Sequence, residues 1–310
     1  MLLSTNIHQF LTENILDLLK KKEIYSVLDF LKVDNNSLTK YCPLTYPEVI
    51  ELKRFLSKKF SAPPIKALSL YQKILKKSAL ISTYIPELDT LLQGGLFTGT
   101  IYELSGYADS EKTELTLTMI QNLIINGKKV YFLDPKKDFS AMNMRARLLK
   151  TEEEEKSLIL LKNILLLQIS DKYELISALF SIKDEIKAGL DIRIIIIHSI
   201  STIFLNSMDY SENNNILNHM ANVLRYIALE LNTVVIVTNL MTIWIEGLND
   251  ESRKETKKKA CCGKYWSSVP NVKIEVGSKN QEGGCEIELV KFNNVWPKDK
   301  TITIPADRFS

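Results

Sequence analysis

The chain has 310 residues, which is enough for one sizeable core and a small accessory domain. Its 40 basic and 37 acidic residues leave a net charge of only +3, which excludes a general attraction to nucleic acid and leaves local basic patches as the candidate contacts. The four cysteines form no Cys-x-x-Cys pair and only three histidines are present, so we expect reduced thiols and no zinc site.

The first ten residues, MLLSTNIHQF, lack a basic segment followed by an apolar core, so we expect no signal peptide. The two longest apolar runs, 158–169 and 192–200, are too short and too interrupted to span a bilayer. These features predict a soluble protein of the cell interior with no membrane partner.

Residues 1–60 show helical periodicity throughout. Apolar side chains recur at three- and four-residue steps, and Val49, Leu52 and Leu56 mark the last and longest helix. We therefore predict a small all-α N-terminal domain over 1–60. Residues 61–78 begin with two adjacent prolines after SA and are only weakly amphipathic, which predicts a linker.

From residue 79 onward, strand-like runs alternate with segments of helical length. We expect strands at 101–105, 129–134, 164–169, 193–198 and 233–239, and helices at 112–126, 140–150, 171–188 and 213–231. This order predicts right-handed βαβ crossovers and a mainly parallel central sheet. Three later runs, at 272–277, 285–292 and 301–304, predict an antiparallel C-terminal extension of that sheet.

Residues 106–113, GYADSEKT, follow the strand-like run TIYELS and precede a helical segment. Gly106, Lys112 and Thr113 match the spacing of a phosphate-binding loop, G-x-x-x-x-G-K-[ST], but Glu111 replaces the glycine before the lysine. In such a loop, backbone N–H groups and the helix dipole hold phosphate, the lysine adds charge and the hydroxyl holds magnesium. By itself the match leaves open a nucleotide site or the remains of one.

Several further segments resemble the ATPase core of RecA-type recombinases. They are ISTYIPELDTLLQGGLFTGTIYELSG (81–106), YFLDPKKDF (131–139), RIIIIHSIS (193–201), VVIVTNL (234–240) and GKYWSSVPNVKIEV (263–276). With the N-terminal segment 38–62 included, the resemblance covers essentially the whole chain. It fits best to the D-type paralogue of the eukaryotic strand-exchange recombinase.

The resemblance implies an α/β, RecA-like P-loop core over 79–310 in a nuclear protein of homologous recombination. It also implies a hetero-oligomer, in which the N-terminal domain contacts one sister paralogue and the core contacts another. The implied cofactors are ATP and magnesium, with the Thr113 hydroxyl on the metal. The implied ATP-binding residues are Gly106, Tyr107, Ala108, Asp109, Ser110, Glu111, Lys112 and Thr113.

Four positions depart from the family pattern. Glu111 brings a carboxylate toward phosphate, and two unit charges about 4 Å apart repel by about 4 kcal/mol at an effective dielectric of about 20. Lys136 stands where a glutamate orients the attacking water, and Leu240 stands where a glutamine senses the γ-phosphate. His198 replaces the aspartate that orders the waters around magnesium.

A neutral imidazole binds magnesium poorly. We expect His198 to be a strand-end histidine bonded to a neighbouring hydroxyl such as Ser199 or Ser201, and the alternative is a transition-metal ligand or a proton carrier. Together the four departures predict negligible ATP hydrolysis and no catalytic residues. They leave open nucleotide binding without hydrolysis, and the rival prediction is an active DNA-dependent ATPase.

The polar stretch 247–264 occupies the place of the second DNA loop of RecA-type folds. Neutralisation of phosphates by its basic residues predicts binding of single-stranded DNA without regard to sequence, and the alternative is a solvated charge run. Trp244 and Trp266 flank the stretch and are expected to pack inside the fold. The candidate DNA-binding residues are Arg253, Lys254, Lys257, Lys258 and Lys259.

Overall fold

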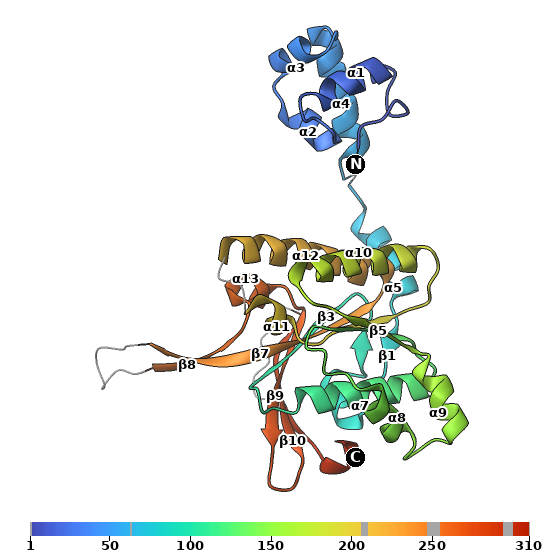
Figure 1. Ribbon diagram of the computed structural model, residues 1–310, viewed down its shortest axis with the longest axis vertical. Coiled ribbons are helices and arrows are strands. Elements are labelled where there is room, and N and C mark those ends of the chain that lie inside the picture. The colour runs from blue at the N-terminus through green and yellow to red at the C-terminus, as the bar shows by residue number, and fades with distance from the viewer. Residues whose placement is uncertain (1, 63, 206–209, 247–254, 294–299, 310) are drawn as a thin grey trace. The chain divides into compact units, whose positions relative to one another are not determined.

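The computed structural model describes residues 2–62, 64–205, 210–246, 255–293 and 300–309 (Figure 1). The chain divides into two compact units, 1–73 and 74–310, and each unit is described by itself. No helix within the described ranges is long and apolar enough to cross a membrane.

The first unit contains a bundle of short helices, as predicted. They are α1 (Glu13–Lys20), α2 (Val27–Lys32), α3 (Asn35–Tyr41) and α4 (Tyr46–Phe60). The helices begin where side chains satisfy free backbone N–H groups: the Ser26 hydroxyl accepts from the Asp29 N–H, and the Asp34 carboxylate accepts from the Ser37 N–H. Apolar side chains from all four helices close a core of their own around Phe30.

A helix, α5 (Ala67–Lys77), occupies most of the segment that we predicted as a linker. Its apolar side chains are exposed: Leu68 is 66%, Tyr71 59% and Leu75 60% accessible. The amphipathic pattern of this segment is therefore strong enough to specify a helix, although the helix buries none of these three side chains.

The second unit is built on a mixed sheet of nine strands, and this confirms the predicted α/β class (Figure 1). The order is β11-β10-β9-β3-β7-β6-β4-β5, with β8 paired to β7. The strands from β9 to β5 in this order are parallel, whereas β10 and β11 add the predicted antiparallel extension. The strands are β3 (Ile101–Gly106), β4 (Val130–Asp134), β5 (Ile164–Gln168), β6 (Ile194–Ile197), β7 (Val234–Glu246), β8 (Glu255–Ala260), β9 (Val272–Lys279), β10 (Cys285–Phe292) and β11 (Thr301–Ile304).

Helices cover both faces of this sheet. In β6 all four isoleucines are buried: Ile194 and Ile196 lie in the core beneath α7, α8 and α9, while Ile195 and Ile197 lie in the core beneath α10 and α12. Figure 1 shows these two groups of helices on opposite sides of the sheet. The helices are α6 (Pro86–Leu91), α7 (Lys112–Ile125), α8 (Ala141–Leu148), α9 (Glu154–Leu161), α10 (Lys172–Lys187), α11 (Ile200–Phe204), α12 (Tyr210–Leu231), α13 (Gly263–Ser268) and the 3-10 helix η2 (Ala306–Phe309). Strands β1 (Leu80–Ile81) and β2 (Leu96–Phe97) form a separate small sheet.

Strand β7 continues well beyond residue 239, where we expected it to end. Its outer part, Met241–Glu246, pairs antiparallel with β8. We call these two segments, Met241–Glu246 and Glu255–Ala260, the ribbon, and Figure 1 shows it projecting from the sheet. The prediction of a loop was wrong for 255–260, because backbone pairing with β7 makes a strand of a sequence, ETKKKA, that has little apolar alternation.

Candidate functional site

The loop between β3 and α7 has the backbone setting of a phosphate-binding loop. Strand β3 is buried along its whole length and ends at Gly106, and α7 begins at Lys112. A Cβ added at Gly106 would lie 2.4 Å from both the Ser110 Oγ and the Val276 carbonyl oxygen. Only glycine therefore fits at this position, because the loop packs directly against β9.

The Lys112 side chain folds back into its own loop. Its Nζ donates to the carbonyl oxygens of Gly106 (3.0 Å) and Tyr107 (2.5 Å) and to the Ser110 Oγ (2.7 Å). Burial, together with the neighbouring Lys136, lowers the pKa of Lys112 to about 8, against the opposing effect of Asp109. All three protons of the ammonium group are thus matched by acceptors within the loop.

Two backbone donors of the loop are also satisfied by the protein. The Ser110 N–H donates to the Tyr107 carbonyl (3.1 Å), and the Glu111 N–H donates to the Gly277 carbonyl of β9 (3.0 Å). Burial, and then the charge of Glu111, raise the pKa of Cys285 to about 11. The Glu111 N–H therefore fastens the loop to β9, and the Ser110 N–H is bonded within the loop, so both donors already have partners in the protein.

His198, which follows β6, bridges the loop to strand β7. Its Nε2 lies 3.2 Å from the Thr113 Oγ1 and its Nδ1 lies 3.0 Å from the Thr238 Oγ1. Burial lowers the pKa of His198 to about 4, so the imidazole is neutral and carries one N–H. One threonine hydroxyl accepts that N–H and the other donates to the bare nitrogen.

The expectation of a hydroxyl-bonded histidine is confirmed, but the named partners were wrong. Ser199 and Ser201 bond to each other at 2.7 Å. His198 instead bonds to Thr113 in the first turn of α7 and to Thr238 of β7, which is the strand next to β6 in the parallel sheet.

A magnesium ion does not fit this arrangement. The Thr113 hydroxyl is already bonded to His198, and a cavity of only about 10 Å³, room for about one water molecule, lies between Thr113, Asp138 and His198. Across the described residues no three His, Cys, Asp or Glu side chains are grouped to hold a metal ion. The magnesium role implied for Thr113 is therefore not supported by its surroundings.

The other altered positions, Lys136 and Leu240, also have polar contacts within the fold, next to a turn closed by Asp134 and to Asn239 respectively. The Asp134 carboxylate, at the end of β4, accepts from the N–H groups of Lys137 and Phe139, both at 2.9 Å, and so closes the turn that follows. Lys136 forms an ion pair with Asp138 at 2.7 Å. Leu240 donates its backbone N–H to the Asn239 Oδ1 at 2.9 Å.

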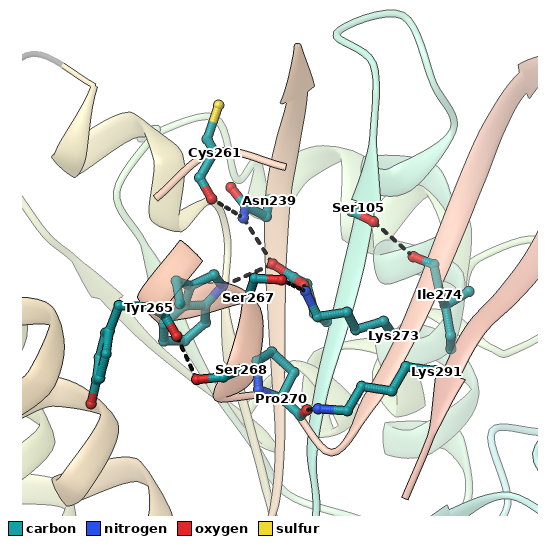
Figure 2. Close-up of polar contacts among 12 residues, drawn as sticks. Ser105, Asn239, Cys261, Tyr265, Ser267, Ser268, Pro270, Lys273, Ile274 and Lys291 are labelled. Atoms are coloured by element: carbon teal, nitrogen blue, oxygen red, sulfur yellow. Dashed lines mark hydrogen bonds and ion pairs between the residues drawn. The ribbon is translucent and has the colours of Figure 1, made fainter. Parts of the chain in front are cut away.

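A buried polar cluster on the opposite face of the sheet was not predicted. Glu103 of β3 is fully buried, and its Oε1 accepts from the Asn239 Nδ2 and the Trp266 Nε1, both at 2.8 Å. Its Oε2 lies 3.0 Å from the Lys273 Nζ, which also donates to the Ser267 Oγ (Figure 2). The available signal was a single glutamate within the otherwise apolar strand TIYELS.

Three of the five candidate DNA-binding residues lie in the ribbon. The register pairs Lys257 with Trp244, Lys258 with Ile243 and Lys259 with Thr242, whereas Arg253 and Lys254 lie outside the described residues. Trp266 is fully buried, as expected, and the Trp244 side chain is outside the described part of the chain.

A pocket of about 660 Å³ lies at the base of the ribbon. Phe204 of α11 and Leu217 of α12 form part of its apolar lining, and Ile243 and Lys259 of the ribbon contribute to the same pocket. Its walls thus combine apolar surface with a cationic side chain on the strand that carries the candidate DNA-binding lysines.

Comparison with known proteins agrees with this architecture. The model of the Rad51 family matches residues 75–283, and the model described as "RAD51D, N-terminal domain" matches residues 1–57. The "DNA repair protein RAD51 homolog 4" of Mus musculus is 27% identical over 273 residues, covering 85% of this chain and 80% of that protein. The Bos taurus protein of the same name is 25% identical over 283 residues, covering 88% and 84%.

The "DNA repair protein RAD51 homolog 2" of Homo sapiens is 27% identical over 262 residues, covering 76% of this chain and 66% of that protein. The Rad51 model spans more than half of the chain and covers the strands of the second unit from β1 to β9. The chain therefore belongs to the Rad51 family, as a RAD51 paralogue with an N-terminal domain of the RAD51D type.

Proposed function

We propose that this chain acts in DNA repair by homologous recombination, as a nuclear RAD51 paralogue subunit that binds sister paralogues and single-stranded DNA without hydrolysing ATP. Family membership and the names of its relatives support the role in recombination. The hydrogen bond between Thr113 and His198 is the main observation that supports the proposed loss of ATP hydrolysis.

Phosphoryl transfer depends on groups that position the phosphates and neutralise their charge. In this chain the metal-binding hydroxyl is held by an imidazole, and the ammonium group of Lys112 is held by its own loop. Lys136 is held in an ion pair with Asp138 and provides no carboxylate to orient water, and Leu240 offers no side-chain hydrogen bond to a γ-phosphate. The residues present therefore do not fit magnesium–ATP chemistry, and we assign no catalytic residue.

A hydrolysis assay on the full chain with single-stranded DNA tests this proposal. We expect phosphate release from ATP at the same low rate in the native chain and in Lys112→Ala. The reason is that the Lys112 ammonium group bonds within its own loop and takes no part in hydrolysis. Turnover by the native chain that Lys112→Ala abolishes would overturn the proposal. That result would favour the alternative function, an active DNA-dependent ATPase. The retention of β3, the loop and α7 is consistent with this alternative.

The proposed DNA contact is the ribbon. Its three consecutive lysines lie on a strand that projects beyond the sheet, where a flexible polyanion can reach them (Figure 1). The apolar pocket at its base offers a surface for unstacked bases. We propose Arg253 and Lys254 as further contacts from sequence alone.

The proposed paralogue contacts involve the N-terminal domain over 1–60 and the segment 61–78 that follows it. The exposed apolar side chains of α5, Leu68, Tyr71 and Leu75, support a partner surface, because exposed apolar patches commonly mark contacts between proteins. The core, over 79–310, would contact a second sister paralogue.

A further inference from the structure

Strand β7 belongs to both the central sheet and the ribbon. Its residues up to Leu240 pair with β3, the strand that leads into the phosphate loop, and from Met241 onward it pairs with β8. Whatever holds Thr238 and Asn239 therefore sets the direction in which the ribbon leaves the sheet. These two neighbouring residues point to opposite faces, because side chains alternate along a strand.

On one face, Thr238 is joined to the phosphate loop. The chain of contacts runs from the Thr238 hydroxyl to the His198 Nδ1 (3.0 Å) and from the His198 Nε2 to the Thr113 hydroxyl (3.2 Å). Thr238 is fully buried and His198 is 3% exposed, so water cannot readily replace the hydrogen bond between these two side chains if it breaks.

On the other face, Asn239 is held by the Glu103 cluster. Its Nδ2 donates to the Glu103 Oε1 (2.8 Å) and to the Cys261 carbonyl (3.0 Å), which directly follows β8. Its Oδ1 accepts from the Leu240 N–H at 2.9 Å, so every polar group of this side chain is used. Figure 2 shows Asn239 between Cys261 and the end of the Lys273 side chain. Both strands of the ribbon are thus fastened where they leave the sheet.

We propose that His198 is a positioning residue that joins the phosphate loop to the ribbon in the place of a metal-bound nucleotide, so that the ribbon binds single-stranded DNA without nucleotide. This inference rests on the proposed DNA-binding function of the ribbon. A magnesium–nucleotide that took the Thr113 hydroxyl would break the Thr113–His198 bond and so disconnect Thr238 from the phosphate loop. Since coupling between two sites is reciprocal, nucleotide does not strengthen DNA binding.

The test measures the affinity of the full chain for a fluorescently labelled oligo-dT strand by anisotropy, with and without millimolar ATP and magnesium. We expect tight binding without nucleotide and no increase with it. Thr113→Val removes the hydroxyl with little change in shape and is expected to weaken binding about tenfold, within the usual range of coupling between sites. Thr113→Ser keeps the hydroxyl and is expected to bind like the native chain.

His198→Ala is expected to weaken binding as Thr113→Val does, with an unchanged dependence on salt, because the lysines that meet phosphate are still present. His219→Ala, an exposed histidine of α12, is the matched control and should leave the affinity unchanged. Circular dichroism establishes that each variant is folded, and if His198→Ala does not fold, the Thr113→Val and Thr113→Ser pair decides the result.

The outcomes separate this inference from the proposed function. Binding that ATP and magnesium strengthen tenfold, or equal affinities of Thr113→Val and Thr113→Ser, would overturn the role of His198. If the native chain does not bind the strand, or if replacing Lys257, Lys258 and Lys259 by alanine leaves its salt dependence unchanged, the proposed DNA contact itself is wrong and the inference falls with it.

Discussion

His198 is neutral because it is buried between two hydroxyl groups. Desolvation disfavours the imidazolium form and lowers the pKa of His198 from 6.5 to about 4, while the Asp138 carboxylate opposes this shift. A proton on the imidazole would also remove the nitrogen that accepts a threonine hydroxyl. The charge state of this residue is therefore tied to its two hydrogen bonds.

This pKa predicts how stability depends on pH. Between pH 6.5 and about pH 4 the unfolded chain binds a proton at His198 that the folded chain does not bind. The contribution of His198 is fully present above pH 6.5 and falls by about 3 kcal/mol as the pH approaches 4, at about 1.4 kcal/mol per pH unit. Urea unfolding at pH 7 and pH 4.5 should show a smaller loss for His198→Gln than for the native chain. Equal losses would contradict the prediction.

Glu103 is a buried charge whose partners are also buried. Glu103→Ala leaves the Lys273 ammonium group without its counter-charge, and we expect the free energy of unfolding to fall by about 3–5 kcal/mol. The double variant Glu103→Ala, Lys273→Met removes both charges and should recover much of this loss. Denaturant unfolding at neutral pH measures both values, and a double variant no more stable than Glu103→Ala would argue against the ion pair.

The ribbon forms because its two strands pair through their backbones, and not because the residues of β8 have a high strand propensity. The strand ETKKKA has three consecutive lysines, which are poor strand formers, and it is extended because β7 provides backbone partners from Met241 to Glu246. The same pairing places Lys257, Lys258 and Lys259 at successive positions of one strand.

The lysines of the ribbon predict a specific salt dependence. For single strands, the slope of log affinity against log salt changes by about 0.7 per neutralised phosphate, so the triple replacement of Lys257, Lys258 and Lys259 by alanine should reduce the slope by about 2. The matched control is the triple replacement of Lys20, Lys21 and Lys22 by alanine in the N-terminal domain, which should leave the slope unchanged. Anisotropy titrations between low and high salt distinguish the two, and equal slopes would rule out the ribbon as the contact.

At the scale of the molecule, the two units have separate hydrophobic cores. The first is closed by α1 to α4, and the second lies on the two faces of the nine-stranded sheet. The helix α5 spans the division at residues 73 and 74, and its apolar side chains belong to none of these cores. Among the described residues, α5 is thus an amphipathic helix whose apolar side chains are not part of either unit's core.

This exposed helix predicts where partners bind. Leu68 and Leu75 are seven residues apart and share one face of α5. Replacing both by serine should weaken co-purification of the full chain with co-expressed sister paralogues, while its unfolding changes by no more than about 0.5 kcal/mol, because both side chains are exposed. Gln72→Ser on the same helix is the control. Undiminished co-purification of the double variant would exclude this face.

The sequence by itself determined the order of the elements and the place of the loop. Strands β10 and β11 were predicted to the residue, and β3, β4 and α7 to within one residue, because apolar periodicity and turn residues are local signals. The four altered positions were also visible locally, since each stands at a fixed distance from a recognisable motif. Helix α9 and the ribbon were missed, because their local pattern is weak.

Only the tertiary structure decided how the polar groups pair. Thr113 and His198 are 85 residues apart, and Glu103 and Trp266 are 163 residues apart, so no local pattern links them. A low-dielectric interior strongly favours partners for buried donors and acceptors, and the order of the parallel strands selects which partner is within reach. The sequence predicted that the phosphate loop departs from the family pattern, and the fold determined that Thr113 of this loop is bonded to His198 and, through it, to Thr238 of β7.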